Sequence, residues 1–415
     1  MKKHLFLCLF AAMTFGGVFT SCSDDDSIVN PITTESTFTV DNGLTLTYNG
    51  EALLGKKVVY TPSETEPTKA TLTLMGVDFD LVQQMRSSRG INFNTPGVLP
   101  GSIETKLDIN VTINGDKCLF EGKSETEFCT FAYKGEVSKS NLTLNLTEVA
   151  LKEKGLVGQW NLDQKVMDDF GWEVISTPLH LEWDSKEQFK VAPFPGFPEV
   201  DMPGKSVVGI VLDNLMLCEK VEGEETKKIT VLDMLVASFK DVRFAEDGNV
   251  TANIVDYANG KTTAEVSPKN VAFYVVDKMP SKESRGSMRL FLNLETINEI
   301  ANANKSKSRA DLDINSLLAM VNPLIQNGIS LTLISNEEGK LSVILDTEFL
   351  MPIFKNVILP LLSDETIASS LLEMIKNNED FKSFVPTAEA VLKQLPGVIN
   401  TTDKMEIGLN FTLNK

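Results

Sequence analysis

The sequence predicts an α+β protein in which antiparallel sheet dominates and amphipathic helices gather at the C-terminal end. The first observation is a period-two alternation of apolar and polar residues that recurs along much of the chain and is typical of half-buried strands. The second is the Asn114-Gly115 dipeptide, which predicts a hairpin turn. The third is a group of helical apolar stripes concentrated after about residue 311.

Residues 38–155 are predicted to form an all-β domain. One strand ends at Asn114-Gly115 and carries apolar residues at alternate positions, namely Leu107, Ile109, Val111 and Ile113. A later strand repeats the alternation with Leu142, Leu144 and Leu146. Residues 152–155 are three charged residues followed by a glycine, so we expect the domain to end there.

Residues 156–310 are predicted to form a mixed, mostly β domain. One strand places Leu179, Leu181 and Trp183 on one face and His180, Glu182 and Asp184 on the other. The polar, basic stretch at residues 302–309 is typical of a linker or an exposed loop.

Residues 311–415 are predicted to be an α+β C-terminal portion, either separate or forming one body with residues 156–310. Asp313 is a suitable cap for a helix, and residues 331–345 fit a hairpin. Two further amphipathic helices follow. The last strand has the cleanest alternation, with its apolar face at Met405, Ile407, Leu409, Phe411 and Leu413.

The start of the chain has the features of an exported lipoprotein. Two lysines, an apolar stretch at residues 5–15 and small residues before Cys22 predict a signal peptide over residues 1–21. A cysteine at the cleavage point predicts lipidation of Cys22, so the chain would reach its membrane through acyl groups. Residues 22–37 are then expected to be a lipidated tether. A non-lipidated signal peptide is the alternative.

The residues after Cys22 resemble the start of Bacteroidetes surface lipoproteins. In that group acidic residues after the lipidated cysteine direct export to the exterior, and here these are Ser23, Asp24, Asp25 and Asp26. Ser27, followed by Ile28, fits the O-glycosylation pattern of that phylum. The resemblance implies an outer-membrane protein facing the exterior, with the periplasmic face as the alternative. It covers only about the first 28 residues; the rest is similar only in style to lipoproteins built from domains of unknown function.

Charge argues against nucleic acid as a partner. Removal of Lys2 and Lys3 with the signal peptide leaves 37 basic and 57 acidic residues, a net charge of about −20. Such a surface repels phosphate backbones. Nucleotide is disfavoured too, because residues 50–57 nearly fit a phosphate-binding loop but Lys57 stands where the motif needs Ser or Thr.

The chemistry-bearing residues predict a non-enzymatic protein without metal or cofactor. His180 is the only histidine of the mature chain, and its place on the polar face of a strand indicates a surface residue. A serine triad needs a histidine placed as its base, and a zinc site usually needs several His or Cys ligands, so this single histidine supports neither. A glycosidase is an alternative, since it needs only two carboxylates, and Asp168-Asp169 beside Trp172 is the most suggestive pair.

Two cysteines leave alternatives open. Cys118 and Cys129 lie symmetrically about residues 122–126, so a hairpin centred there would bring them opposite one another. An oxidising compartment would then permit a disulfide. Two buried free thiols are the other interpretation.

The first functional hypothesis is a surface lipoprotein that binds glycan or protein through loops of its β-rich portion. The expected binding surface is formed by Trp172, Phe194 and Phe197, which lie in glycine- and proline-containing loops. The second hypothesis is a carrier of a lipid-like apolar ligand, suggested by the aliphatic residues 349–362. The glycosidase is the third.

Overall fold

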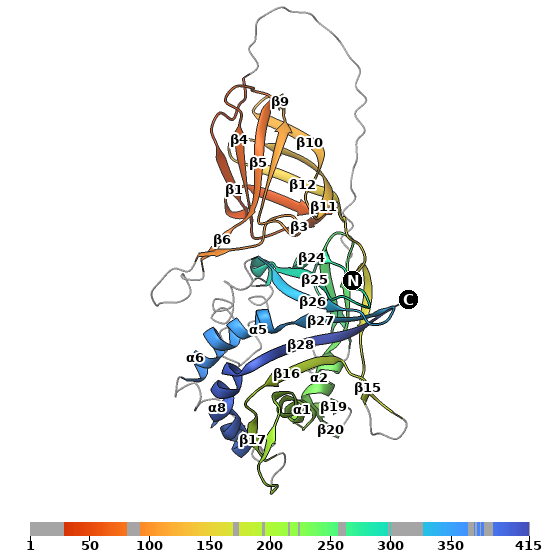
Figure 1. Ribbon diagram of the computed structural model, residues 1–415. Coiled ribbons are helices and arrows are strands. Elements are labelled where there is room, and N and C mark those ends of the chain that lie inside the picture. Colours follow the sequence, from red (N-terminus) through yellow and green to blue (C-terminus); the bar gives the residue numbers. More distant parts are fainter. Residues whose placement is uncertain are drawn as a thin grey trace, which may run out of the picture.

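The computed structural model describes the chain from Val29 to Asn414 with internal gaps. The described residues are 29–80, 92–168, 174–192, 196–214, 216–222, 225–255, 263–297, 299, 327–363, 369, 372–373, 375–376 and 385–414. They form an N-terminal all-β domain and a larger second domain, which lie one above the other in Figure 1. Strands predominate, the sheets are mainly antiparallel, and a helix lies near the C-terminus, as the α+β prediction requires.

The N-terminal domain contains two sheets. The four-stranded sheet has the order β1 (Ser36–Thr39), β4 (Lys56–Pro62), β5 (Lys69–Gly76) and β8 (Glu104–Asn110). The six-stranded sheet has the order β3 (Glu51–Ala52), β2 (Leu44–Tyr48), β12 (Leu142–Leu151), β11 (Cys129–Val137), β10 (Lys117–Glu125) and β9 (Thr112–Asn114). Alternate side chains of both sheets are buried, so the core lies between them. A short hairpin of β6 (Asp78–Asp80) and β7 (Asn92–Asn94) extends from this domain.

The predicted strand at residues 107–113 is divided between the two sheets. It belongs to β8 up to Asn110 and to β9 from Thr112 onward. The expected turn at Asn114-Gly115 is present, and Gly115 has the positive φ of +62° that favours glycine. One continuous alternating segment therefore serves both layers.

The second domain is built on a sheet that closes on itself. Eight strands form the ring: β13 (Gly158–Leu162), β21 (Phe239–Phe244), β22 (Asn249–Ile254), β24 (Ala272–Lys278), β25 (Gly286–Leu292), β26 (Ile329–Ile334), β27 (Lys340–Leu345) and β28 (Thr402–Leu413). Pairing of β28 with β13 completes the ring. Strand β16 (Leu179–Ser185) pairs with the first part of β28, and β23 (Glu265–Val266) pairs with β22. Strands on both sides of residue 310 share this sheet, so residues 156–310 and 311–415 form one structural unit.

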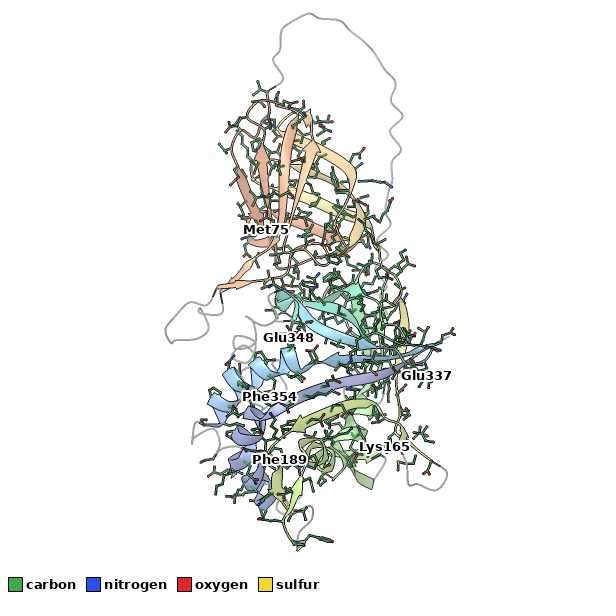
Figure 2. The ribbon with its side chains drawn as sticks, in the orientation of Figure 1. Met75, Lys165, Phe189, Glu337, Glu348 and Phe354 are labelled. Carbon is green, nitrogen blue, oxygen red and sulfur yellow. The ribbon has the colours of Figure 1, made fainter. Side chains whose placement is uncertain are left out.

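Helices lie at one end of this sheet. They are α1 (Gly204–Asn214), α2 (Val231–Ser238), α5 (Thr347–Ile353), the π-helix η4 (Phe354–Ile358), α6 (Leu359–Leu362) and α8 (Val385–Asn400). Thr230 caps α2 and Asp346 caps α5 through their side chains. Helix α8 contains one of the predicted apolar stripes, whereas the helix predicted from Asp313 lies outside the described residues. A second core lies here, and Figure 2 shows Phe189 and Phe354 within this half of the molecule.

Three short hairpins complete the second domain. They are β14 (Val166–Met167) with β15 (Val174–Ser176), β17 (Phe189–Val191) with β18 (Val200–Met202), and β19 (Met216–Glu222) with β20 (Glu225–Thr230). In Figure 1 the hairpin that contains β17 lies at the end of the second domain farthest from the N-terminal domain.

The two domains share one continuous hydrophobic core. Tyr48 packs edge-on against Phe273, with ring centroids 5.2 Å apart, and its hydroxyl donates to the carbonyl of Asp247. The amide side chain of Asn270 donates to the carbonyl of Ala52 at 2.9 Å, and that of Asn293 donates to the carbonyl of Leu54 at 3.2 Å. These contacts fix the end of the N-terminal domain to the closed sheet.

The tether expected over residues 22–37 is shorter than predicted. Asn30 and Ile32 are buried on the N-terminal domain, at 7% and 3% exposure. The Asn30 side chain donates to the carbonyl of Pro67 and to the hydroxyl of Tyr60, and its oxygen accepts from the thiol of Cys118. Burial of one apolar residue and satisfaction of one buried amide explain why the chain is held from Asn30 onward.

One lysine, Lys56, faces the core of the N-terminal domain. It is 1% exposed, and its ammonium donates to the carbonyl of Pro96 at 2.8 Å. Burial lowers the pKa of Lys56 to about 7. Between pH 7 and 10 the unfolded chain therefore holds a proton that the folded protein lacks, so this group makes stability rise with pH.

Replacing Lys56 by Met should remove this dependence. We expect Lys56→Met to raise the free energy of unfolding at pH 7 by roughly 2 kcal/mol, since the desolvated amine costs more than one hydrogen bond returns. The gain should shrink as the pH approaches 10. Urea unfolding at several pH values measures it, with the exposed Lys106→Met as the control. Equal pH profiles for the two variants would contradict the burial argument.

Candidate functional site

The outer face of the six-stranded sheet carries a groove with a volume of about 640 Å³, which we call the outer groove. It crosses β10, β11 and β12 and is lined by Asn110, Thr112, Leu119, Phe120, Glu121, Lys134, Gly135, Glu136, Thr143 and Asn145. Most of these side chains stand on the face opposite the core because strand residues alternate between faces. Phe120 belongs to the core, and its ring packs against Gly135: a Cβ added at that glycine would lie 2.6 Å from the ring.

Strand register places the groove residues in two rows. Leu119 lies opposite Glu136, which lies opposite Thr143, and Thr143 lies beside Thr45. In the next row Glu121 lies opposite Lys134, which lies opposite Asn145. The second row ends at Thr47, whose hydroxyl donates to Asn145 Oδ1 at 2.7 Å. Four adjoining strands therefore present hydroxyl, amide and charged groups to one surface.

The charges of the outer groove balance. Lys134 pairs with Glu121 at 2.9 Å. The remaining groove carboxylate, Glu136, pairs at 2.8 Å with Lys117, which lines the adjoining hollow. Both pairs are exposed, so each contributes little to stability. Together the two cations and two anions leave this part of the surface without net charge.

A second hollow of about 370 Å³ extends the outer groove toward β2. It shares Glu136 and Thr143 with the groove and adds Thr45, Ser138 and Asn141. Gly43 borders it with φ of +97°, and a Cβ there would lie 2.2 Å from the carbonyl oxygen of Ser140. The turn at residues 138–141 can therefore approach the sheet closely only beside glycine.

A third hollow, of about 480 Å³, lies at the domain junction. Asp41, Glu295 and Glu299 line it together with Lys56 and Lys57. Burial, aided by the charges of Glu299 and Asp41, raises the pKa of Glu295. Carboxylates outnumber the charged lysines in this hollow, and Leu54 in its lining accepts the hydrogen bond from Asn293 that joins the domains.

The predicted aromatic surface falls largely outside the described residues. Trp172 and Phe194 lie in undescribed ranges, whereas Phe197 is 61% exposed in the loop between β17 and β18. The hairpin that leads to and from Trp172 also exposes apolar side chains, including Val174 and Ile175. The proposed role of the three aromatics stays a prediction. Cys22, the acidic residues 24–26 and Ser27 likewise lie outside the described residues.

The hairpin geometry considered for Cys118 and Cys129 is wrong. The register pairs Cys118 with Val137 and Cys129 with Leu151, because the turn lies at residues 126–128 rather than 122–126. Both cysteines are buried free thiols. Burial raises the pKa of each thiol, which keeps it protonated and unreactive.

His180 is more enclosed than its polar strand face predicted, with its side chain 21% exposed. Its Nε2 lies 2.9 Å from a carboxylate oxygen of Glu406, and Arg285 donates to the same carboxylate at 2.6 Å. Glu406 itself is only 5% exposed. Burial alone would raise the pKa of Glu406, but the hydrogen bonds from Arg285 and His180 outweigh burial and lower it.

Two carboxylates meet here, since Glu182 lies opposite Glu406 on the neighbouring strand. A hydrogen bond from Lys205 lowers the pKa of Glu182 as well. A carboxylate pair that cleaves glycosides needs one member protonated near neutral pH. The pair Glu182 and Glu406 lacks that feature, and its geometry is that of an ion network joining β16, β28 and the loop before β25.

Comparison with known proteins does not assign this chain to a family. No family model, curated protein or solved structure matches the chain. Within the described ranges, no helix has the length and apolar character needed to cross a bilayer. The described residues also contain no group of three or more His, Cys, Asp or Glu side chains suited to a metal ion.

Breaking the Glu406 network should destabilise the second domain. We expect Glu406→Gln to lower the free energy of unfolding by roughly 1–2 kcal/mol at pH 7, because charge-assisted hydrogen bonds to Arg285 and His180 are weakened while Arg285 stays half-exposed to solvent. The lowered pKa of Glu406 means that this stabilisation exists above the unfolded pKa and is lost as the pH falls. The difference between wild type and variant should therefore narrow toward pH 3. Urea unfolding measures it, with the exposed Glu338→Gln as control; equal losses in both variants would contradict the network.

Proposed function

We propose that the protein is a non-enzymatic, lipid-anchored binding protein of the cell envelope that holds a neutral glycan in the outer groove. The observation that carries this proposal is the composition of the groove: hydroxyl and amide side chains with two internally balanced ion pairs. Sugar hydroxyls bind through hydrogen bonds of this kind, and balanced charges neither attract nor repel a neutral ligand.

Charge distinguishes this ligand from other classes. The mature chain has a net charge of about −20, which repels polyanions such as nucleic acid or sulfated glycans. A protein partner would be expected to meet a larger apolar centre than Leu119 provides. A neutral glycan is therefore favoured over a protein partner.

The lipid anchor would present the groove close to the membrane. With Cys22 acylated and Asn30 held on the N-terminal domain, seven residues lie between the two, and the eight steps from one Cα to the other span at most about 28 Å. The Asn30 side chain donates a hydrogen bond to Tyr60, which lies on β4. The domain junction lies beside Gly55, at the other end of the same strand. The second domain would therefore lie on the side away from the bilayer.

Removing one hydroxyl shared by the outer groove and the adjoining hollow, that of Thr143, and one from the hollow alone, that of Thr45, tests the proposal. The mature chain with Cys22→Ser is titrated with a panel of neutral oligosaccharides by calorimetry. Thr45→Val with Thr143→Val should weaken any binding by about 10-fold or more, because two hydrogen bonds are lost while β-branched shape is kept. The matched control is Thr71→Val with Thr73→Val, which makes the same change on the outer face of the other sheet.

The outcomes of this titration distinguish the outer groove from the aromatic loops as the binding site. Binding that survives the groove change but is lost when Trp172, Phe194 and Phe197 are replaced together by Ala would assign the ligand to the aromatic loops. A panel without any binder would overturn the glycan proposal. Hydrolysis of a bound oligosaccharide would show that the protein is an enzyme.

A further inference from the structure

One row of side chains on the outer face of the six-stranded sheet runs at right angles to the strands, and we call it the central row. Strand register places its members directly beside one another on five successive strands, from β9 through β10, β11 and β12 to β2. The members are Thr112, Leu119, Glu136, Thr143 and Thr45. Adjoining strands are about 4.8 Å apart, so four steps give the row a length of roughly 19 Å.

The outer groove and the adjoining hollow meet along the central row. Thr112 lines the groove at one end of the row, and Thr45 lines the hollow at the other end. Glu136 and Thr143, between them, line both. None of the five side chains is buried. The two hollows therefore form one continuous trough, which follows the row across the strands.

Other side chains stand on both sides of the central row. On one side lies the ion pair of Glu121 and Lys134, whose side chains are more than 70% exposed. On the other side Lys117 stands on the same face of β10 and lines the hollow together with Ser138 and Asn141. A ligand that follows the row has free space along it but meets side chains to either side.

The chemistry of the central row suits a chain of sugar rings. Its threonines offer hydroxyls, and Glu136 offers a carboxylate that accepts hydrogen bonds. Leu119 offers an aliphatic surface for the C–H face of a ring. Consecutive members lie about one strand spacing apart, which is close to the advance per ring of an extended glycan. Successive rings of such a chain would therefore meet successive members of the row.

We propose that the ligand of the trough is an unbranched, extended chain of about four neutral pyranose rings that lies along the central row. This inference rests on the glycan-binding function proposed above and names the kind of glycan. Chains whose linkages are equatorial on both rings are extended and can follow a straight row, whereas an axial linkage coils the chain away from it. Branches would meet the side chains that flank the row.

Calorimetry with a series of chain lengths tests this inference. The mature chain with Cys22→Ser is titrated with cello-, manno- and xylo-oligosaccharides of two to six rings, which share the extended linkage. We expect the affinity to rise with each ring up to about four rings and then to level off. Maltotetraose, which coils, and a xyloglucan heptasaccharide, which adds branches to a cellotetraose backbone, should bind at least 10-fold more weakly than the extended tetrasaccharide.

Variants at the two ends of the row test whether the ligand spans it. Thr112→Val and Thr45→Val should each weaken the tetrasaccharide by about 5-fold or more, because it reaches both ends and loses a hydrogen bond at each. A disaccharide is too short to span the row, so at most one of the two variants should weaken it. Thr112→Ser keeps the hydroxyl and should bind as wild type does. The matched control is Thr130→Val, at an exposed position of β11 outside the trough.

Two kinds of failure can be told apart. Equal affinity for a disaccharide and a tetrasaccharide, or for cellotetraose and its branched counterpart, would overturn this inference and leave the proposed function standing. Tetrasaccharide binding by Thr112→Val that is as tight as binding by Thr130→Val would do the same. A panel in which no glycan binds would overturn the proposed function together with this inference.

Discussion

Backbone hydrogen bonds made by β28 hold the second domain together. This strand pairs with β27 along one edge, and its other edge is divided between β13 and β16. Among the described ring strands β22 also has three partners, but one of these is the two-residue strand β23, whereas all three partners of β28 are main strands of this sheet. Because β13 and β28 are about 240 residues apart in the sequence, the domain can close only after nearly the whole chain has been made. The helices at its end pack on the part of β28 that extends past the ring.

The proposed groove follows from how strands present their two faces. In the N-terminal domain the core uses one face of the six-stranded sheet, and the other face is left with threonine, asparagine and paired charges. In the second domain one apolar core lies within the closed sheet and a second lies among the helices. The contacts of Tyr48 and Asn270 join the two domains, so the outer groove has a fixed place relative to the closed sheet.

Local patterns in the sequence predicted the strands well but not their partners. The turn at Asn114-Gly115 and the alternation of β28 were correct because both depend on neighbouring residues. The closure of β28 on β13 could not be predicted, since alternation defines a face and not a partner strand. Alternation places Glu406 on the face opposite the apolar side chains, and its hydrogen bonds with Arg285 and His180, far away in the sequence, explain why it is buried there. The hairpin centre expected at residues 122–126 was placed a few residues too early, because alternation does not determine where two strands turn.

The outer groove was harder to predict from the sequence than the strands that form it. Thr143 and Asn145 were visible as the polar face of a strand, but a polar face is usually only solvated, and the rows formed with Thr45 and Lys134 exist only once the register is known. The available clue was that the polar positions of this strand hold threonine and asparagine, where a solvated face often holds lysine and glutamate.

Hydrogen–deuterium exchange resolved to single strands tests most directly whether β28 closes the second domain. The structure predicts that amides of β28 and β13 exchange together and most slowly in the domain, through global unfolding, because neither strand can open without breaking the ring. Rapid exchange of β13 while β27 and β28 stay protected would contradict this, since it would mean that the sheet is open between its first and last strands.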